Sequence, residues 1–219
     1  MNQGSDEYRS IAPVYDPLLS PFLRLVRSRV VSLALDHRLR RVIDLCCGTG
    51  EQSRMLRQQG IQAFGIDLSP AMLARAVSKR PQGGYVLGDA ALLPFQPRSF
   101  DGAILSFALH EKSPAQQQDI LQQAQQVLTD QGTLIVIDFC RPGRLLSSPA
   151  LLLIMAVERL AGAGHFANFR QYMKAGGLQG LLQLNPGLET TARTHYFMGT
   201  VSLELVRVVQ DFFSKTPAR

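Results

Sequence analysis

Short apolar runs alternate with longer mixed segments along the first two thirds of the chain. A glycine, proline or polar turn follows each run, which predicts buried strands separated by helices. Ser69 and Pro70 indicate one helix start, since serine is a common N-cap and proline is favoured at the first helical position. Gly60 and Gly132 are expected to end the helices before them. The predicted strands are 42–45, 63–66, 85–87, 101–106 and 134–137, and the predicted helices are 52–59, 70 onward and 114–128.

The amino-terminal segment predicts a helix only from about Phe22. Pro13, Pro17 and Pro21 precede that residue, and proline removes a backbone donor and clashes with the preceding helical turn. From residue 22 to residue 35, apolar residues and arginines recur at helical spacing, which favours an amphipathic helix against the sheet.

The last third of the chain changes character after Cys140. Residues 145–184 are apolar, contain many small residues and are predicted to be mostly helical. Residues 189–208 are predicted to form two strands with a turn at Gly199, which would pair as an antiparallel edge. The expected fold class is therefore α/β: a doubly wound, mostly parallel seven-stranded sheet with an antiparallel carboxyl-terminal edge and a helical cap.

Composition indicates one globular domain. The chain has 219 residues, of which 46% are hydrophobic and 18% charged, enough to bury a full core. Its three cysteines form no disulfide framework, which favours a reducing cytoplasm, and no histidine or further cysteine completes a metal site with Cys46 and Cys47. The longest apolar run, 149–157, is shorter than the ~20 residues that span a bilayer, so no transmembrane helix is expected.

The net charge of +6 could suit nucleic acid or an anionic membrane surface. The arginines are spread along residues 24–41, however, where solvated helix faces explain them at least as well. Nucleic acid is therefore the less favoured partner.

The stretch Arg41–Ser53 carries the clearest chemical signal, because it predicts a strand, a glycine turn and a helix start. Such a turn lets a ligand approach the backbone closely, and the N–H groups of the helix start favour electron-rich groups. The dinucleotide fingerprint needs a third glycine where Ser53 stands, so an NAD-dependent oxidoreductase is disfavoured. Asp44 and Glu51 would repel a pyrophosphate and suit a ligand that carries an ammonium group.

The segment VIDLCCGTG, residues 42–50, resembles the first motif of class I S-adenosylmethionine (SAM) dependent methyltransferases, with Cys46 where the first glycine usually stands. Four later segments resemble the following motifs in order. The pattern is similar to the ubiquinone/menaquinone C-methyltransferase type and to related small-molecule methyltransferases. The four later segments are 61–72, 85–91, 100–110 and 132–139.

The resemblance implies a SAM site at the carboxyl ends of the strands, with S-adenosylhomocysteine as the product. Asp67 would accept hydrogen bonds from both ribose hydroxyls, and Asp89 would face the adenine amino group. Asp44 would balance the charged methionine end, with the glycine turn beneath it. The implied cofactor-binding residues are Asp44, Cys46, Gly48, Gly50, Asp67, Leu68, Met72, Asp89, Ala90 and Ser106.

His110 and Tyr15 are the candidate catalytic residues. His110 follows the fourth predicted strand, and a histidine with a near-neutral pKa can take a proton from an oxygen or carbon acid. Tyr15 and Asp16 resemble a lid pair that closes over the methyl donor in quinone-type methyltransferases. A structural role is the alternative for both candidates. His165, Tyr172 and His195 could line an acceptor pocket, but each is more simply structural.

The expected function is SAM-dependent methyl transfer to a small, apolar acceptor that is quinone-like, lipid-like or another small molecule. The apolar stretch Leu151–Met155 would line its pocket or contact a membrane surface, and a helix–sheet core is the competing account. A SAM-binding regulatory protein without turnover and a nucleic-acid methyltransferase are the alternatives.

The expected organisation is one methyltransferase domain over residues 1–219, located in the cytoplasm or peripherally at a membrane surface. Its predicted parts are an amino-terminal lid and helix (1–35), a SAM-binding core (40–140) and a helical cap over the acceptor site (145–184).

Overall fold

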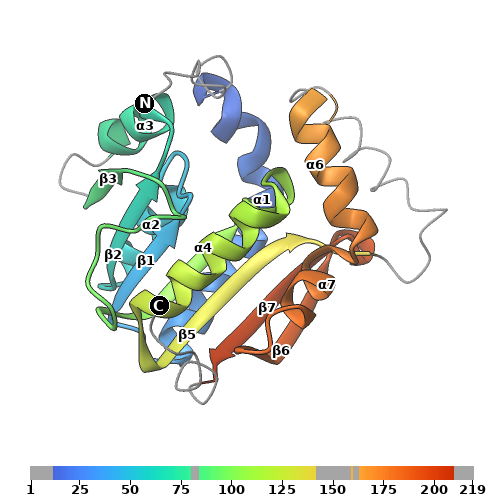
Figure 1. Ribbon diagram of the computed structural model, residues 1–219. Coiled ribbons are helices and arrows are strands. Elements are labelled where there is room, and N and C mark those ends of the chain that lie inside the picture. Colours follow the sequence, from blue (N-terminus) through green and yellow to red (C-terminus); the bar gives the residue numbers. More distant parts are fainter. Residues whose placement is uncertain (1–11, 80–83, 142–158, 160–162, 210–219) are drawn as a thin grey trace.

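The computed structural model describes residues 12–79, 84–141, 159 and 163–209. The strands in these residues are β1 Arg41–Leu45, β2 Gln62–Asp67, β3 Tyr85–Leu87, β4 Phe100–Ser106, β5 Leu128–Phe139, β6 Leu188–Tyr196 and β7 Val201–Val208. They form one seven-stranded sheet in the order β3-β2-β1-β4-β5-β7-β6 (Figure 1). This topology confirms the predicted fold class.

Parallel pairing places the ends of the central strands at one edge of the sheet. Strand β1 lies between β2 and β4, and Asp44 is in register with Gly65 on one side and Ile104 on the other. Strand β7 pairs antiparallel with both β5 and β6, which confirms the antiparallel edge. The carboxyl ends of β1, β2, β4 and β5 therefore meet at the edge where ligands of such sheets bind.

Helices cover both faces of the sheet (Figure 1). Apolar side chains of α1 and α2 form one core with the sheet, and those of α4, α6 and α7 form the core on the other face. Two short 3-10 helices, η1 Leu109–Glu111 and η2 Phe197–Gly199, follow β4 and β6. The helices are α1 Ala12–Asp36, α2 Glu51–Gln58, α3 Pro70–Lys79, α4 Pro114–Val127, α6 Ala163–Lys174 and α7 Gly177–Gln183.

Helix α1 begins at Ala12, so the prediction of a helix only from about Phe22 was wrong. Pro13 lies in the first turn, where its missing N–H would have no helical acceptor. Pro17 and Pro21 each remove one donor, but the residues between them still supply helical hydrogen bonds, and Val26 and Val30 bury the later turns against the sheet. The structure describes only the backbone of Tyr15, so its catalytic role stays a prediction.

The boundary between α4 and β5 also differs from the prediction. The helix begins as expected, with a capping box between Ser113 and Gln116, and it ends at Val127, within one residue of the predicted end. Strand β5, however, begins at Leu128 rather than at Leu134, so Gly132 lies within the strand instead of before it. Leu128 already pairs with Phe100, and the register between β4 and β5 then shifts. Residues 129–132 thus form a bulge between the pairs Phe100–Leu128 and Gly102–Thr133, which the glycine signal could not reveal.

The predicted helical cap is described only in part. Helices α6 and α7 lie within residues 145–184, whereas the stretch Leu151–Met155 lies outside the described residues. No helix in the described part of the chain is long and apolar enough to cross a membrane.

Candidate active site

The turn Cys46–Gly50 joins the end of β1 to α2, and its backbone is strongly bent. Cys46, Gly48 and Gly50 have φ of 55°, 54° and 69°, so Cys46 adopts the left-handed conformation that glycine adopts without strain. A Cβ placed on Gly48 would meet nothing within 4 Å. The turn therefore has open space beside its backbone, as a closely approaching ligand requires.

Tyr85 and Arg57 support this turn from the other side. The Tyr85 hydroxyl donates to the Gly50 carbonyl over 3.3 Å, and Arg57 Nη1 donates to the same hydroxyl over 2.9 Å. The Arg57 guanidinium also stacks on the Tyr85 ring at 4.6 Å, while its Nε donates to the Ala63 carbonyl. The position of the turn thus depends on β3 and α2 as well as on β1, which the sequence motif did not indicate.

Asp44 is buried at the end of β1 and connects that strand to α2. One of its carboxylate oxygens accepts hydrogen bonds from the Ser53 hydroxyl at 2.6 Å and the Ser53 N–H at 3.1 Å. Burial raises the pKa of Asp44 to about 6, although the Ser53 hydroxyl opposes the shift. These two hydrogen bonds tie the Asp44 carboxylate of β1 to Ser53 of α2. The role of Asp44 at the methionine end of SAM stays a prediction.

We expect stability to fall as pH rises from about 4 to about 6, because folded Asp44 keeps a proton that the unfolded chain releases near 3.8. The loss attributable to Asp44 is at most about 3 kcal/mol. Asp44→Asn should remove this part of the slope, as measured by urea unfolding at pH 4, 5, 6 and 7. Asp130→Asn, at an exposed ion pair with Arg98, should retain it. Equal slopes in wild type and Asp44→Asn would contradict the assignment.

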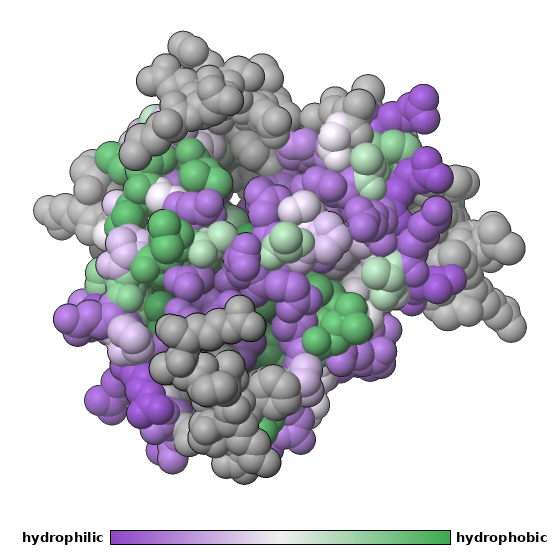
Figure 2. Space-filling model, viewed as in Figure 1, coloured by the Kyte–Doolittle hydropathy of each residue, from purple (hydrophilic) through white to green (hydrophobic). Residues whose placement is uncertain are grey.

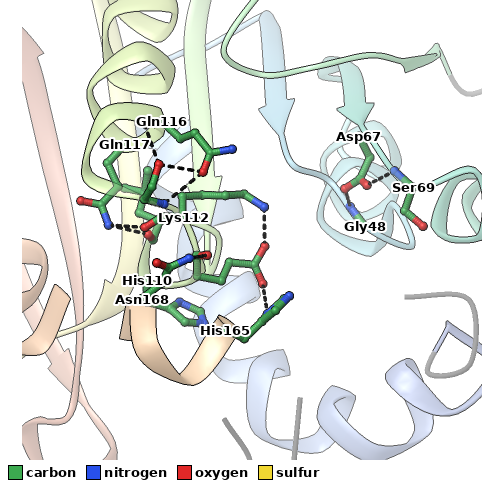
Figure 3. A network of polar contacts seen from close by, with 12 residues as sticks. Gly48, Asp67, Ser69, His110, Lys112, Gln116, Gln117, His165 and Asn168 are labelled. Atoms are coloured by element: carbon green, nitrogen blue, oxygen red, sulfur yellow. Dashed lines mark hydrogen bonds and ion pairs between the residues drawn. The ribbon is translucent and has the colours of Figure 1, made fainter. Parts of the chain in front are cut away.

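Asp67 links the end of β2 to both neighbouring segments. Its Oδ2 accepts the Gly48 N–H at 2.7 Å and its Oδ1 accepts the Ser69 N–H at 2.9 Å (Figure 3). Burial raises the pKa of Asp67, while the two N–H groups lower it. Each carboxylate oxygen has two lone pairs, so each keeps one acceptor position for a ribose hydroxyl. Ser69 Oγ accepts the Met72 N–H at 3.1 Å, which confirms the predicted N-cap.

The surface around α3 and β3 is apolar. Figure 2 shows hydrophobic residues gathered on this part of the molecule, where Leu68 and Leu87 are 58% and 59% exposed. Met72 and Ala90 are buried, and the exposed Asp89 accepts the Ala91 N–H at 2.8 Å through its carboxylate. This surface borders the position that the resemblance implies for adenine, and the roles of these residues there stay predictions.

The opposite side of the site is formed by the end of β4 and the residues after it. Ser106, the last residue of β4, lies partly buried. His110 is buried in η1, and its Nδ1 lies 2.7 Å from Asp138 Oδ1 at the end of β5. Phe139 and Phe169 pack edge-on against the imidazole, at ring centroid distances of 4.7 Å and 6.1 Å. Sequence reasoning missed Asp138, although its place near the carboxyl end of a strand was a usable signal.

A polar network next to His110 connects η1 to α6. Glu111 Oε1 lies 2.7 Å from Lys112 Nζ, and its Oε2 lies 3.5 Å from His165 Nδ1. Asn168 Nδ2 donates to the Glu111 carbonyl over 2.8 Å. Figure 3 shows this network on one side and the Asp67 contacts on the other, with Lys112 extending between them. Burial lowers the pKa of Lys112, but Glu111, Cys46 and Asp67 together more than offset it, and the pKa stands above its usual value.

The remaining candidates divide between this site and the far edge of the sheet. His165 joins the network through Glu111, whereas His195 is exposed on β6 and contacts Gln179. Tyr172 is buried in α6, and its hydroxyl has no hydrogen-bond partner among the described residues. Within the same residues, no group of three or more His, Cys, Asp or Glu side chains could hold a metal ion.

Comparison with known proteins extends the resemblance. Residues 42–132 match the model of a methyltransferase domain family. A Synechocystis protein named as an uncharacterized methyltransferase is 41% identical over 58% of this chain and 60% of its own length. A demethylmenaquinone methyltransferase of Thermus thermophilus is 34% identical over 62% of this chain and 65% of its own. The match thus spans about three fifths of these relatives' lengths.

A solved O-methyltransferase from neocarzinostatin biosynthesis, in complex with SAM and 2-hydroxy-5-methyl naphthoic acid, has the same fold. It aligns with a TM-score of 0.65 at 21% identity, over 94% of this chain and 59% of its own. The sequence motifs, the sheet order and these similarities agree. Residues 42–132 are therefore similar to a methyltransferase domain, and the sheet has the fold of a solved methyltransferase.

Proposed function

We propose that this chain transfers a methyl group from SAM to a small, apolar acceptor. The observation that carries the proposal is the 2.7 Å hydrogen bond between the Gly48 N–H and Asp67, beside a turn with open space next to Gly48. A carboxylate with remaining acceptor capacity and an accessible turn backbone fit the ribose and the methionine end of SAM.

SAM, when bound, would supply an electrophilic methyl group, with its sulfur as the leaving group. The task of the chain is to align the acceptor and to exclude water. Asp67 would fix the ribose, and the Cys46–Gly50 turn would pass beneath the methionine end. His110 and Glu111 lie in η1, which follows β4, and α6 packs on η1. The acceptor would enter between this side and the side that carries Asp67 (Figure 3).

Two observations support an apolar, flat acceptor. Phe139 packs edge-on against both Phe107 and Phe169, at 5.6 Å and 5.5 Å, next to His110. Aromatic groups of this kind favour a planar apolar ring by offset or edge contacts. The Thermus relative is named for a methylation of demethylmenaquinone, which has such a ring. We therefore infer a reduced naphthoquinone or a similar ring as the acceptor class.

Asp67→Ala is expected to weaken SAM binding by about 1.5 to 3 kcal/mol, because two ribose hydroxyls lose an ionised acceptor. Titration calorimetry with SAM, S-adenosylhomocysteine and NAD measures this loss. Asp130→Ala, which removes an exposed carboxylate on β5, should bind SAM like wild type. Thermal unfolding of each variant separates lost contacts from a lost fold. Failure of the wild-type chain to bind SAM, or a preference for NAD, would refute the proposal.

Turnover is tested with a demethylated menaquinol that carries a short prenyl chain, and the methylated product is detected by mass spectrometry. Product formation supports the acceptor class. SAM binding without transfer to any of a broad acceptor panel would instead favour a regulatory SAM-binding protein. RNA or DNA binding that falls steeply with salt would favour a nucleic-acid methyltransferase.

A further inference from the structure

Lys112 is a partly buried lysine that lies between the two sides of the candidate site. Its side chain is 22% exposed and extends from the end of η1 toward the side that carries Asp67 (Figure 3). No sequence pattern indicated this residue, because lysine side chains mostly lie in solvent. A lysine that points inward at this place can contact a ligand bound between the two sides.

The backbone contacts of Lys112 do not depend on its side chain. Its N–H donates to the Leu109 carbonyl over 3.1 Å, and its carbonyl accepts the Gln117 side-chain amide over 2.9 Å. Any residue other than proline would supply the same two backbone groups at this position. The turn after η1 can therefore form without an ammonium group.

The ammonium group of Lys112 has more donors than the described residues use. An ammonium carries three N–H groups. Lys112 Nζ donates to Glu111 Oε1 over 2.7 Å and has no second acceptor among the described residues. That carboxylate is shared, since its Oε2 lies 3.5 Å from His165 Nδ1. Two N–H groups of Lys112 thus remain for water or for an oxygen atom of a ligand.

The neighbours of Lys112 keep it protonated. Burial lowers the pKa of Lys112, but Glu111, Cys46 and Asp67 together more than offset this effect, so the pKa stands above its usual value. Cys46 and Asp67 belong to the cofactor side, which means that the ammonium lies close enough to that side to feel its charges. A compact positive charge with little solvent around it attracts an anionic oxygen more strongly than an exposed lysine does.

We propose that Lys112 binds the acceptor through a ring oxygen in its anionic form, so that the acceptor is a hydroxylated ring rather than a hydrocarbon or an amine. This inference rests on the proposed function and names the group of the acceptor that the site recognises. A phenol-type hydroxyl has a pKa of about 10 in water. An adjacent cation lowers such a pKa by about 1–3. The O–H bond then breaks, its proton passes to solvent water, and the bonding pair stays on the ring oxygen.

The binding of 2-naphthol tests this proposal, because its ionised form absorbs at a longer wavelength than its protonated form. The probe is titrated with pH in the presence of excess chain, with and without S-adenosylhomocysteine. We expect the pKa of bound 2-naphthol to lie about 1–3 below that of the free compound. Lys112→Met should abolish the difference, whereas Lys174→Met, at an exposed lysine in the last turn of α6, should retain it. An unchanged pKa with the wild-type chain, or no binding of 2-naphthol, would overturn the proposal.

Two further variants separate the ammonium group from the structure around it. Lys112→Met leaves the Glu111 carboxylate without its cation, so Glu111→Gln combined with Lys112→Met removes both charges. We expect this double variant to resemble Lys112→Met, and Lys112→Arg, which keeps a cation, to retain part of the pKa difference. Recovery of the wild-type value in the double variant would mean that an uncompensated carboxylate caused the defect, and the proposal would be wrong. Should Lys112→Met not fold, the wild-type and double-variant titrations still decide.

A second ligand distinguishes a ring oxygen from a carboxylate, which carries the same kind of anionic oxygen. If Lys112→Met weakens the binding of 2-naphthoate at least tenfold while wild type leaves the pKa of 2-naphthol unchanged, Lys112 recognises a carboxylate and the ring-oxygen assignment is wrong.

This proposal and the proposed function can fail separately. If the chain binds SAM but 2-naphthol keeps its pKa, the role of Lys112 is wrong and the methyltransferase proposal stands. If the chain lowers the pKa of 2-naphthol but binds no SAM, the proposed function fails. The oxyanion site then exists, but it is not the acceptor site of a methyltransferase.

Discussion

Gly50→Ala is expected to lower the free energy of unfolding by about 3 kcal/mol and to abolish measurable SAM binding. At a φ of +69°, alanine costs about 1–2 kcal/mol of backbone strain. The added Cβ would also lie 2.5 Å from the Tyr85 hydroxyl, which donates to the Gly50 carbonyl and accepts from Arg57. Tyr85 must therefore move, and the turn that we propose to support the cofactor moves with it. Urea unfolding and SAM titration measure the two effects.

Gly60→Ala is the matched control for this experiment. Gly60 has a φ of +80°, but a Cβ there would meet nothing within 4 Å, and the residue follows α2 away from the site. The Gly60→Ala variant should lose only the stability that backbone strain costs, and it should bind SAM like wild type. Gly48→Ala should be similarly stable yet bind SAM weakly, because its methyl group would enter the open space beside the turn. Equal effects of the Gly50 and Gly60 changes would show that Tyr85 does not constrain the turn.

Phe100→Ala should lower the free energy of unfolding by about 3–5 kcal/mol. Phe100 is 0% exposed, and its ring packs edge-on against Phe64 and Phe95 at 5.7 Å and 5.3 Å. The Arg41 guanidinium also lies 5.2 Å from its ring centroid. Truncation leaves a cavity that rigid strands on both sides cannot fill. Denaturant unfolding monitored by circular dichroism measures the loss.

Leu92→Ala is the control for the cavity argument, because Leu92 is apolar but 78% exposed. It should change the unfolding free energy by less than about 0.5 kcal/mol. Phe100→Leu should fall between the two, since it removes fewer buried atoms. If Phe100→Ala lowered the free energy of unfolding by less than about 1 kcal/mol, the strands and Arg41 would have to fill the cavity that the ring leaves.

Some features of this protein follow from short sequence segments. The run before Cys46 is apolar enough to be a strand, and β1 and β3 match the predictions within one residue. Ser69 and Pro70 defined the start of α3 because capping depends on atoms only three residues apart. The glycine turn and Asp67 predicted a cofactor site, because each follows a short apolar run that the sequence pattern predicts to be a strand.

Other features depend on segments that are distant in the chain. Pro17 and Pro21 suggested a broken segment, yet α1 includes them, because tertiary burial of later turns outweighs local propensity. The early start of β5 depended on pairing between Leu128 and Phe100, which no local glycine signal encodes.

The sequence by itself determined the α/β class, the order of the central elements and the turn that would hold the cofactor. Only the tertiary structure decided which side chains act together, because hydrogen bonds such as those of Asp138 with His110 and of Tyr85 with Gly50 join residues 28 and 35 positions apart. Parallel pairing of β1, β4 and β5 brings these groups to one edge of the sheet. The His110 side chain is thus held by a carboxylate that its own segment does not contain.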